Sequence, residues 1–216
     1  MVTDSKKRKI AVANIKDRII HRLIYEHLVP IFDKTFIFDV WSCRKNKGLT
    51  MAIERTQKLF RGQKNFYCWR ADIEKFFDNI DHKLLIKLLF RKVTGSRTRR
   101  LLKMIINSYT SNKGGQGIPI GNLTSQIFAN IYLNELDRFV KNNLKIKYYL
   151  RYGDDFIVLD SDLENLQNLR YTISNFCQKG LIIKIKRNDT LLKYQEGWNF
   201  WEQKYILRGK ISRKKI

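Results

Sequence analysis

The chain has 216 residues, of which 44% are hydrophobic, and it carries 43 Lys and Arg against 20 Asp and Glu, a formal net charge of +23. This length and composition suffice for a buried core, in one domain or in two closely joined subdomains. No apolar run reaches transmembrane length and no signal peptide opens the chain, so we expect no membrane partner and a cytoplasmic location. Cys43, Cys68 and Cys177 lack metal-type spacing, as expected of a reduced intracellular protein.

The positive charge implies a polyanionic partner, most simply nucleic acid, because Lys and Arg that neutralise phosphates release counterions. Basic residues also alternate with aromatic ones over 64–67 and 145–149, which favours nucleic acid over an acidic membrane surface. A basic chain that is only solvated is the alternative.

The first predicted element is an amphipathic helix over residues 14–28, which Pro30 is expected to end. An extended segment over 32–40 leads to a basic loop, 41–48, and a second helix is predicted over 49–61. In the loop, Arg44, Lys45 and Lys47 place three cations within four residues. Such a loop suits a triphosphate or a backbone phosphate, although many solvated loops have the same composition.

A β-strand is predicted within residues 66–76, with alternating side chains on its two faces. One face carries Phe66, Cys68, Arg70 and Asp72, and the other carries Tyr67, Trp69, Ala71 and Ile73. Asp72 therefore ends an apolar strand, where a buried carboxylate needs a partner, either a metal ion or an Arg side chain. Asp81 is predicted to cap the apolar helix that follows.

Another basic helix is predicted over 97–110, followed by a glycine-rich loop over 114–121 and then a long helix. The apolar face of the basic helix is expected to consist of Leu101, Met104, Ile105 and Tyr109. The buried stripe of the long helix is expected to consist of Ile127, Phe128, Ile131, Leu136 and Phe139.

Residues 145–159 are predicted to form a β-hairpin, because Tyr148, Leu150 and Tyr152 alternate with polar neighbours and Gly153-Asp154 is a tight-turn signal. Asp154 and Asp155 then lie side by side at its tip. Two adjacent carboxylates repel each other, and a divalent cation such as Mg²⁺ would stabilise them. Ordinary turn chemistry of Asp is the alternative.

The last predicted elements are a helix over 162–179, with Ser161 as its N-cap and Gly180 as its stop, and a pair of short strands. The two strands, over 181–185 and 190–194, are expected to pair with each other and to have basic edges.

Three motifs together resemble the reverse transcriptase family. Residues 70–80, Arg-Ala-Asp-Ile-Glu-Lys-Phe-Phe-Asp-Asn-Ile, resemble the motif with the first catalytic aspartate, and Tyr152-Gly153-Asp154-Asp155 resembles the tyrosine-x-aspartate-aspartate box. Residues 120–126 lie between them, in the order of the family. Most members have Gln-Gly-x-x-x-Ser-Pro there, whereas Ile120 and Gln126 resemble the reverse transcriptases of diversity-generating retroelements, as does the loop 42–48.

The resemblance implies an α+β fold with the fingers and palm of a right-hand polymerase and an antiparallel palm sheet packed on helices. The implied division is fingers over 1–65 and 95–120, palm over 66–94 and 121–196, and a basic tail, 197–216, at the start of a missing or truncated thumb.

The resemblance further implies an error-prone RNA-directed DNA polymerase in which Asp72, Asp154, Asp155 and the backbone of Ile73 bind two Mg²⁺ ions, which Mn²⁺ can replace. Its implied nucleotide-binding residues are Arg44, Lys45, Lys47, Phe77, Ile120, Gly121 and Gln126. Phe77 stands where the family has an aromatic gate against the 2′-hydroxyl, and core packing is its other possible role. Tyr152, Lys184 and Lys186 are expected to contact nucleic acid.

The partners implied by the resemblance are a template RNA, the nascent cDNA, dNTPs and a small basic accessory protein, in a bacterial or phage-encoded system. A reverse transcriptase of the group II intron type is the alternative within the enzyme class. Outside that class, a non-catalytic RNA-binding palm and a metal-free structural domain are the alternatives.

Overall fold

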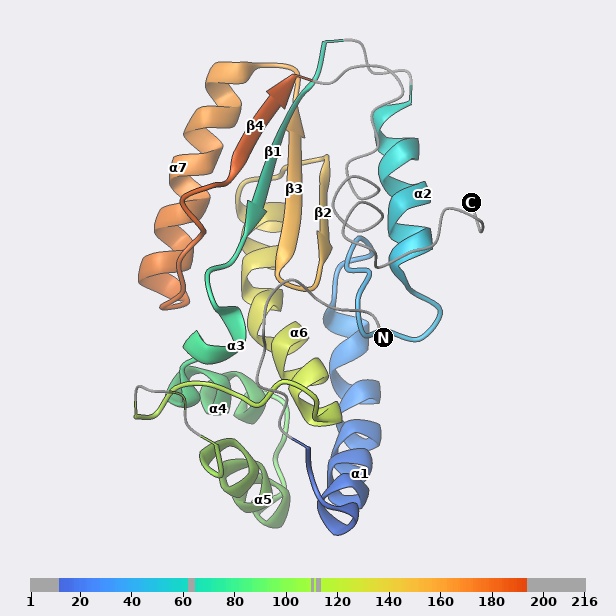
Figure 1. The fold of residues 1–216 in the computed structure, drawn as a ribbon, viewed down its shortest axis with the longest axis vertical. Coiled ribbons are helices and arrows are strands. Elements are labelled where there is room, and N and C mark those ends of the chain that lie inside the picture. Colours follow the sequence, from blue (N-terminus) through green and yellow to red (C-terminus); the bar gives the residue numbers. More distant parts are fainter. Residues whose placement is uncertain (1–11, 62–64, 110, 112–113, 194–216) are drawn as a thin grey trace.

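A four-stranded antiparallel sheet, in the order β2-β3-β1-β4, forms the centre of the molecule (Figure 1). The computed structural model describes residues 12–61, 65–109, 111 and 114–193. The strands are β1 (Tyr67–Asp72), β2 (Tyr149–Tyr152), β3 (Asp155–Asp160) and β4 (Thr190–Lys193). The predicted α+β class with an antiparallel sheet is confirmed, and the predicted tail 197–216 lies outside the described residues.

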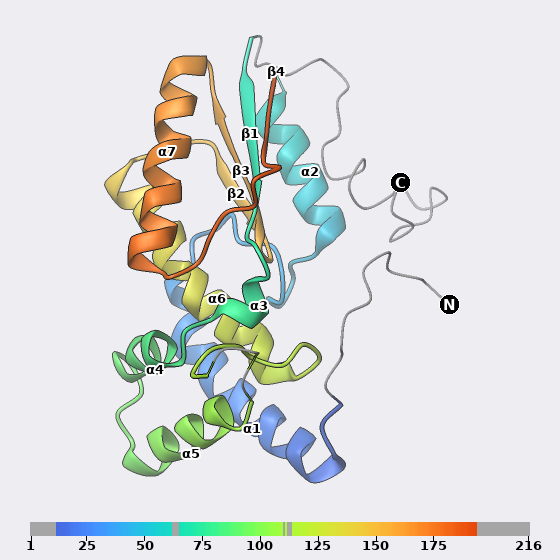
Figure 2. The ribbon, with the colours of Figure 1, turned by 60° about the vertical axis from the view of Figure 1, so that its left-hand side comes forward.

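Helices cover both faces and one end of this sheet. They are α1 (Ile15–Phe32), α2 (Leu49–Phe60), α3 (Phe76–Asn79), α4 (His82–Phe90), α5 (Ser96–Asn107), α6 (Leu123–Arg138), with a π-helical continuation over Phe139–Asn143, and α7 (Leu163–Gly180). Figure 2 shows α2 on one side of the sheet and α7 on the other, while α1, α3, α4 and α5 lie beyond the end where β1 stops.

The alternation predicted for β1 is confirmed by the two hydrophobic clusters on either face of the sheet. Cys68 packs in a small cluster with Ala52 and Ile53 of α2, whereas Trp69, Ala71 and Ile73 belong to the larger core with α6 and α7. Residues of β3 divide in the same way, because successive side chains of a strand point to opposite faces. Which face a β1 or β3 side chain occupies therefore follows from its position in the strand.

The ends of two helices illustrate how the sequence specifies them. Asp81 caps α4 as predicted, since its carboxylate accepts a hydrogen bond from the Leu84 amide at 2.8 Å. In contrast, α1 does not end at Pro30 but continues to Phe32. Phe32 is 4% exposed, so burying its ring in the core offsets the backbone hydrogen bond that Pro30 cannot donate. The segment after it, predicted to be extended, begins with a 3-10 turn over Asp33–Thr35.

The predicted apolar face of α5 was wrong in part. Leu101 and Ile105 pack against the core as predicted, but Leu102 and Ile106 are the buried residues and Met104 is 61% exposed. Apolar side chains stand at five of the six positions 101–106, so two overlapping stripes fit the helical period equally well. Packing against α4 selects between them.

Two predictions near the C-terminal end of the described chain were also wrong. Asp162, not Ser161, caps α7, with its carboxylate accepting from the Glu164 amide at 2.9 Å. The predicted pairing of 181–185 with 190–194 is not found in their described part, which ends at 193. Instead β4 pairs with β1, and residues 184–186 extend the same edge of β1. The backbone groups of that edge of β1 find their hydrogen-bond partners in both segments. Among the described helices, none combines the length and apolarity needed to cross a bilayer.

Candidate active site

Strand register brings the predicted carboxylates to one end of the sheet. Asp72 is the last residue of β1 and lies directly opposite Asp155, the first residue of β3, which in turn lies opposite Tyr152 of β2. Directly opposite residues point to the same face, with Cβ atoms typically about 4.5–5.5 Å apart. Asp154 lies in the turn between β2 and β3. This is the end of the sheet from which the chain leaves β1 towards α3 (Figure 1).

The turn that carries Asp154 is fixed to β1 by its backbone. Gly153 has φ +66°, a left-handed conformation that glycine adopts without steric cost. The carbonyl of Asp154 accepts a hydrogen bond from the amide of Ile73 at 3.2 Å. Asp155 is 3% exposed, whereas Asp72 and Asp154 are half-buried. The three carboxylates thus differ in their access to solvent although they share one end of the sheet.

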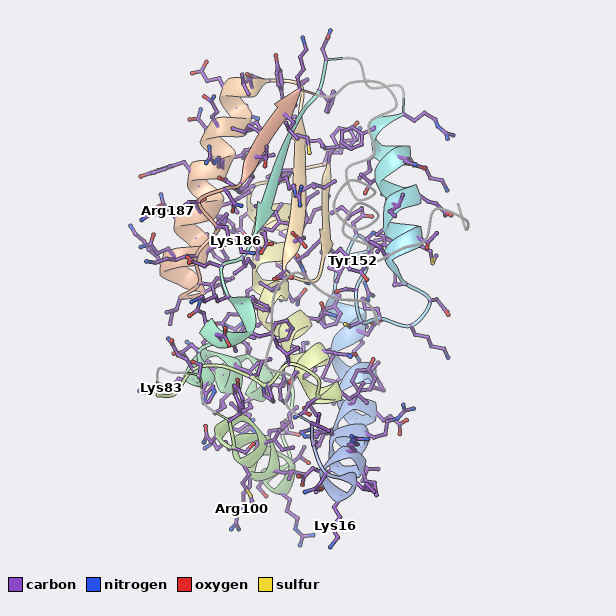
Figure 3. All side chains as sticks on the ribbon, in the orientation of Figure 1. Lys16, Lys83, Arg100, Tyr152, Lys186 and Arg187 are labelled. Atoms are coloured by element: carbon purple, nitrogen blue, oxygen red, sulfur yellow. The ribbon has the colours of Figure 1, made fainter. Side chains whose placement is uncertain are left out.

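A cation of the protein lies at this carboxylate cluster. The ammonium of Lys186 is 2.5 Å from Oδ1 of Asp72, and the amide of Lys186 donates to the Asp72 carbonyl at 2.9 Å. Both side chains of this pair are about one quarter exposed, at 25% and 24%. Figure 3 labels Lys186 on the β4 side of the site and Tyr152 on the β2 side. Burial raises the pKa of Tyr152, so its hydroxyl stays protonated at neutral pH.

The donor set fits a hard divalent cation in the chemical type of its ligand atoms. Carboxylate oxygens are preferred ligands of Mg²⁺, and two carboxylates directly opposite each other repel unless a cation lies between them. Among the described residues, however, no three His, Cys, Asp or Glu side chains are gathered in a geometry that could hold a metal ion. In this structure the Lys186 ammonium forms an ion pair with Asp72.

We therefore expect that replacing Lys186 by Gln strengthens Mn²⁺ binding, because the metal no longer competes with an ammonium for Asp72. In metal-free buffer the variant should lose about 1 kcal/mol of unfolding free energy. Thermal unfolding with and without Mn²⁺ measures both effects. Lys179→Gln, which removes an exposed cation near the end of α7, is the control. Equal stabilisation by Mn²⁺ in the wild type and in both variants would contradict the competition.

Arg44 of the basic loop holds the loop together. Its guanidinium contacts both carboxylate oxygens of Asp33, at 2.7 and 3.1 Å, and donates to the carbonyls of Asp33, Ile37 and Val40. These five hydrogen bonds use all five donors of the side chain. The nucleotide contact predicted for Arg44 stays a prediction, and this conformation offers no further donor for it.

The two lysines of the loop differ in their surroundings. The Lys47 ammonium donates to the Phe38 carbonyl at 2.6 Å and lies over the Phe38 and Trp41 rings, 3.8 and 3.7 Å from their centroids. Burial, followed by the charge of Arg44, lowers the pKa of Lys47. Lys45 is exposed. Of the three predicted cations, Lys45 is therefore the one that the fold presents to solvent.

The glycine-rich loop is tied to the segment that follows β1. The amides of Ile118 and Gly117 donate to the carbonyls of Phe77 and Ile80, both at 2.8 Å. His82 also holds this loop: its ring is buried, and Nε2 lies 2.6 Å from the Gly117 carbonyl oxygen. No signal in the sequence indicates this contact. Phe77 is half-buried, with its ring 5.4 Å from that of Phe76.

The remaining predicted site residues are accessible. Ile120 is half-exposed, Gly121 is exposed with φ +117°, and Gln126 is exposed in the first turns of α6. Lys184 is exposed next to the edge of β1, where its carbonyl accepts from the Glu74 amide at 2.8 Å. Four buried polar side chains behind the turn could not be recognised from the sequence, because polar and charged residues there look like solvent-facing ones. They are Ser42, Asn130, Asp137 and Arg151.

Two known proteins are similar in sequence to about two thirds of this chain. The group II intron-encoded protein LtrA of Lactococcus lactis subsp. cremoris is 31% identical over 148 residues, which are 66% of this chain and 24% of LtrA. Protein YkfC of Escherichia coli K12 is 27% identical over 150 residues, 64% of this chain and 38% of YkfC. The chain thus spans about a quarter to two fifths of the length of these relatives.

Solved telomerase structures share the fold. Apo telomerase from Candida tropicalis superposes with a TM-score of 0.59 at 13% identity, over 83% of this chain and 37% of the telomerase chain. Telomerase from Candida albicans, in complex with a fragment of telomeric RNA, gives 0.54 at 12% identity, over 84% and 34%. The predicted right-hand fold of fingers and palm is thereby confirmed. The sequence pattern described as reverse transcriptase (RNA-dependent DNA polymerase) matches residues 3–195, and the chain belongs to this family.

Proposed function

We propose that this chain is the fingers and palm part of an RNA-directed DNA polymerase that copies a template RNA into cDNA. The observation that carries the proposal is the register of β1 and β3, which sets Asp72 opposite Asp155 with Asp154 in the adjoining turn. The proposed division into fingers and palm follows the boundaries expected from the sequence. The net charge of +23 supports binding to template and cDNA phosphates.

Reverse transcriptase domains generally use divalent metal ions, and we propose two Mg²⁺ ions held by Asp72, Asp154, Asp155 and the Ile73 carbonyl. When bound, such ions lower the pKa of a primer 3′-hydroxyl and neutralise the leaving pyrophosphate. Lys45 would bind the triphosphate of a dNTP, and Phe77 would exclude the 2′-hydroxyl of a ribonucleotide. Ile120 and Gly121 would support the nucleobase, while Gln126, Tyr152 and Lys184 would contact nucleotide or nucleic acid.

Extension of a primed RNA tests this proposal directly. The purified chain, given Mg²⁺ and dNTPs, should extend the primer, whereas Asp154→Ala should bind the same RNA without extending it. Asp154 is half-buried in a turn, so its removal leaves the core intact. RNA binding without extension in both proteins would instead identify a non-catalytic RNA-binding palm. Binding of neither RNA nor Mn²⁺ would favour a metal-free structural domain.

Within this function we propose the diversity-generating type, in the cytoplasm and with a small basic accessory protein, on the basis of Ile120 and Gln126. An apolar residue under the nucleobase removes a polar contact that other members make with glutamine, so control of base-pair geometry should loosen. The group II intron type is the second candidate, because LtrA, a group II intron-encoded protein, is among the relatives. Sequencing of the cDNA separates them: errors concentrated opposite template adenines support the first type, and their absence supports the second.

A further inference from the structure

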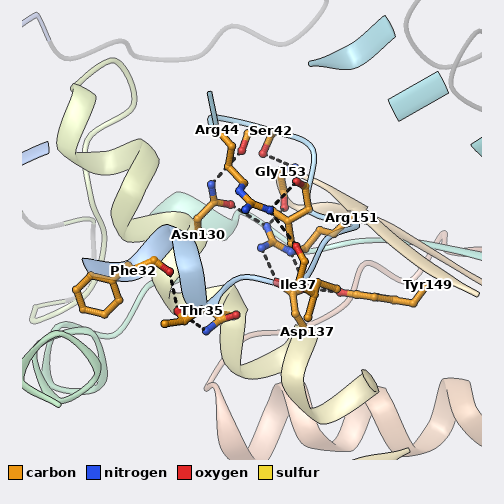
Figure 4. A network of polar contacts seen from close by, with 12 residues as sticks. Phe32, Thr35, Ile37, Ser42, Arg44, Asn130, Asp137, Tyr149, Arg151 and Gly153 are labelled. Atoms are coloured by element: carbon orange, nitrogen blue, oxygen red, sulfur yellow. Dashed lines mark hydrogen bonds and ion pairs between the residues drawn. The ribbon is translucent and has the colours of Figure 1, made fainter. Parts of the chain in front are cut away.

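A buried polar network lies directly behind the turn that carries the carboxylates (Figure 4). Both polar groups of the Gly153 backbone are bound by it. The Gly153 amide donates to the hydroxyl of Ser42 at 2.8 Å, and the Gly153 carbonyl accepts from Nη1 of Arg151 at 2.8 Å. Ser42 is 8% exposed and Arg151 is completely buried. The residue next to Asp154 is therefore fixed by two side chains rather than by solvent.

Asn130 of α6 connects these two side chains. Its Nδ2 donates to the Ser42 carbonyl at 3.0 Å, and its Oδ1 accepts from Nη1 of Arg151 at 3.2 Å. Asn130 is 2% exposed. Hydrogen bonds that are shielded from water are stronger than those at the surface. A buried network of this kind fixes a single conformation as long as each donor and acceptor in it has its partner.

The same network anchors the start of the basic loop. The Trp41 amide donates to the Arg151 carbonyl at 3.0 Å, and the Arg151 amide donates to the Asp39 carbonyl at 2.9 Å. Residues 39–42 thus lie alongside β2, and the loop 43–48 follows immediately. Arg44 then binds back to the Val40 carbonyl at 3.3 Å. The loop and the turn therefore rest on one shared set of hydrogen bonds.

We propose that Ser42, Asn130 and Arg151 are positioning residues that couple the basic loop 43–48 to the turn 153–155. Ser42 and Arg151 bind the backbone of Gly153, and Asn130 connects them, so together they fix the backbone on which both segments stand. Ordering of the loop by a bound triphosphate is then transmitted through Ser42 to the turn that carries Asp154. This inference rests on the proposed function, because it assumes that the loop binds triphosphate and the turn holds the ions.

Ser42→Ala is the sharpest test, because it deletes only the hydroxyl that accepts from Gly153. The Ser42 carbonyl and its bond to Asn130 stay in place. We expect kcat for single-nucleotide addition to fall about tenfold, since one hydrogen bond is lost at the turn, with KM for primed RNA unchanged. Ser42→Thr keeps the hydroxyl and should restore most of the rate. Ser174→Ala is the control, since it removes a part-buried hydroxyl bond within α7, 2.7 Å long.

Amide hydrogen exchange separates coupling from simple support of the fold. In Ser42→Ala, exchange should become about fivefold faster in both segments, 43–48 and 153–155, and Ser174→Ala should change neither. In the wild type, a dNTP should protect both segments, whereas in Ser42→Ala it should protect the loop alone.

Faster exchange confined to Gly153, or an unchanged kcat in Ser42→Ala, would overturn the coupling. A wild-type chain that adds no nucleotide would refute the proposed function instead. In that case the exchange comparison without nucleotide still decides whether loop and turn are coupled.

Discussion

Replacing Asp155 by Asn is expected to slow nucleotide addition on the order of a thousandfold, which corresponds to about 4 kcal/mol of lost transition-state stabilisation. Asparagine keeps the shape of the side chain but removes the charge that a divalent ion would need. The same change removes the repulsion between Asp155 and the directly opposite Asp72, so unfolding free energy should stay constant or rise by about 0.5 kcal/mol. Rates at saturating dNTP and urea unfolding measure the two effects.

Asp160→Asn supplies a matched control on the same strand. Asp160 lies at the opposite end of β3, opposite Tyr67, and its carboxylate accepts hydrogen bonds from the Asp162 amide and the Asn165 side chain. This variant should retain nucleotide addition. If Asp155→Asn kept its activity, or lost it together with several kcal/mol of stability, Asp155 would be a structural residue and not a metal ligand.

The position of the carboxylates could be predicted because strand alternation and turn chemistry are local. The alternation over 66–73 defines the face on which Asp72 lies, and Gly153-Asp154 defines where the hairpin turns. Once β1 and β3 pair, the facing positions of Asp72 and Asp155 follow from the register. No long-range information beyond that one pairing is needed.

The neighbours of these strands could not be predicted in the same way. The second edge of β1 is filled by β4 and by residues 184–186, and the ion pair of Lys186 with Asp72 arises from that long-range pairing. Periodicity tells which residues of a segment share a face, but it does not tell which segment will cover that face. The predicted apolar face of α5 was wrong in part for the same reason.

Arg151 shows most clearly which contacts local sequence patterns do not predict. In the sequence it alternates with Leu150 and Tyr152, as a solvent-facing residue of a half-buried strand would. In the fold, residues 39–42 and α6 cover it completely, and α6 supplies a buried carboxylate, Asp137. A cationic side chain in a strand and an anionic one in a helix carry no local signal that they will meet.

Asp137→Asn should therefore cost about 3–5 kcal/mol of unfolding free energy, the largest stability loss that we expect from a single charge removal in this chain. Nε and Nη2 of Arg151 bind the two oxygens of Asp137 at 2.8 and 2.7 Å, and both side chains are 0% exposed. Burial opposes the charge of Arg151, but the charge of Asp137 and its hydrogen bonds outweigh burial and raise the pKa of Arg151. The guanidinium thus stays charged, and asparagine would leave it buried without its counter-charge.

Urea unfolding at neutral pH measures this loss, and the exposed pair of Arg91 and Glu135 provides the comparison. Its N–O distance of 2.9 Å is similar, but its side chains are 50% and 27% exposed, so Glu135→Gln should cost at most about 1 kcal/mol. The double variant Arg151→Met with Asp137→Leu should recover much of the loss, because no unpaired charge is then buried. If the Asp137→Asn variant unfolded no more easily than the Glu135→Gln variant, solvent or another group would have to compensate the charge of Arg151. Since Arg151 also binds the Gly153 carbonyl, loss of its counter-charge should disturb the turn that carries Asp154 before it disturbs the rest of the sheet.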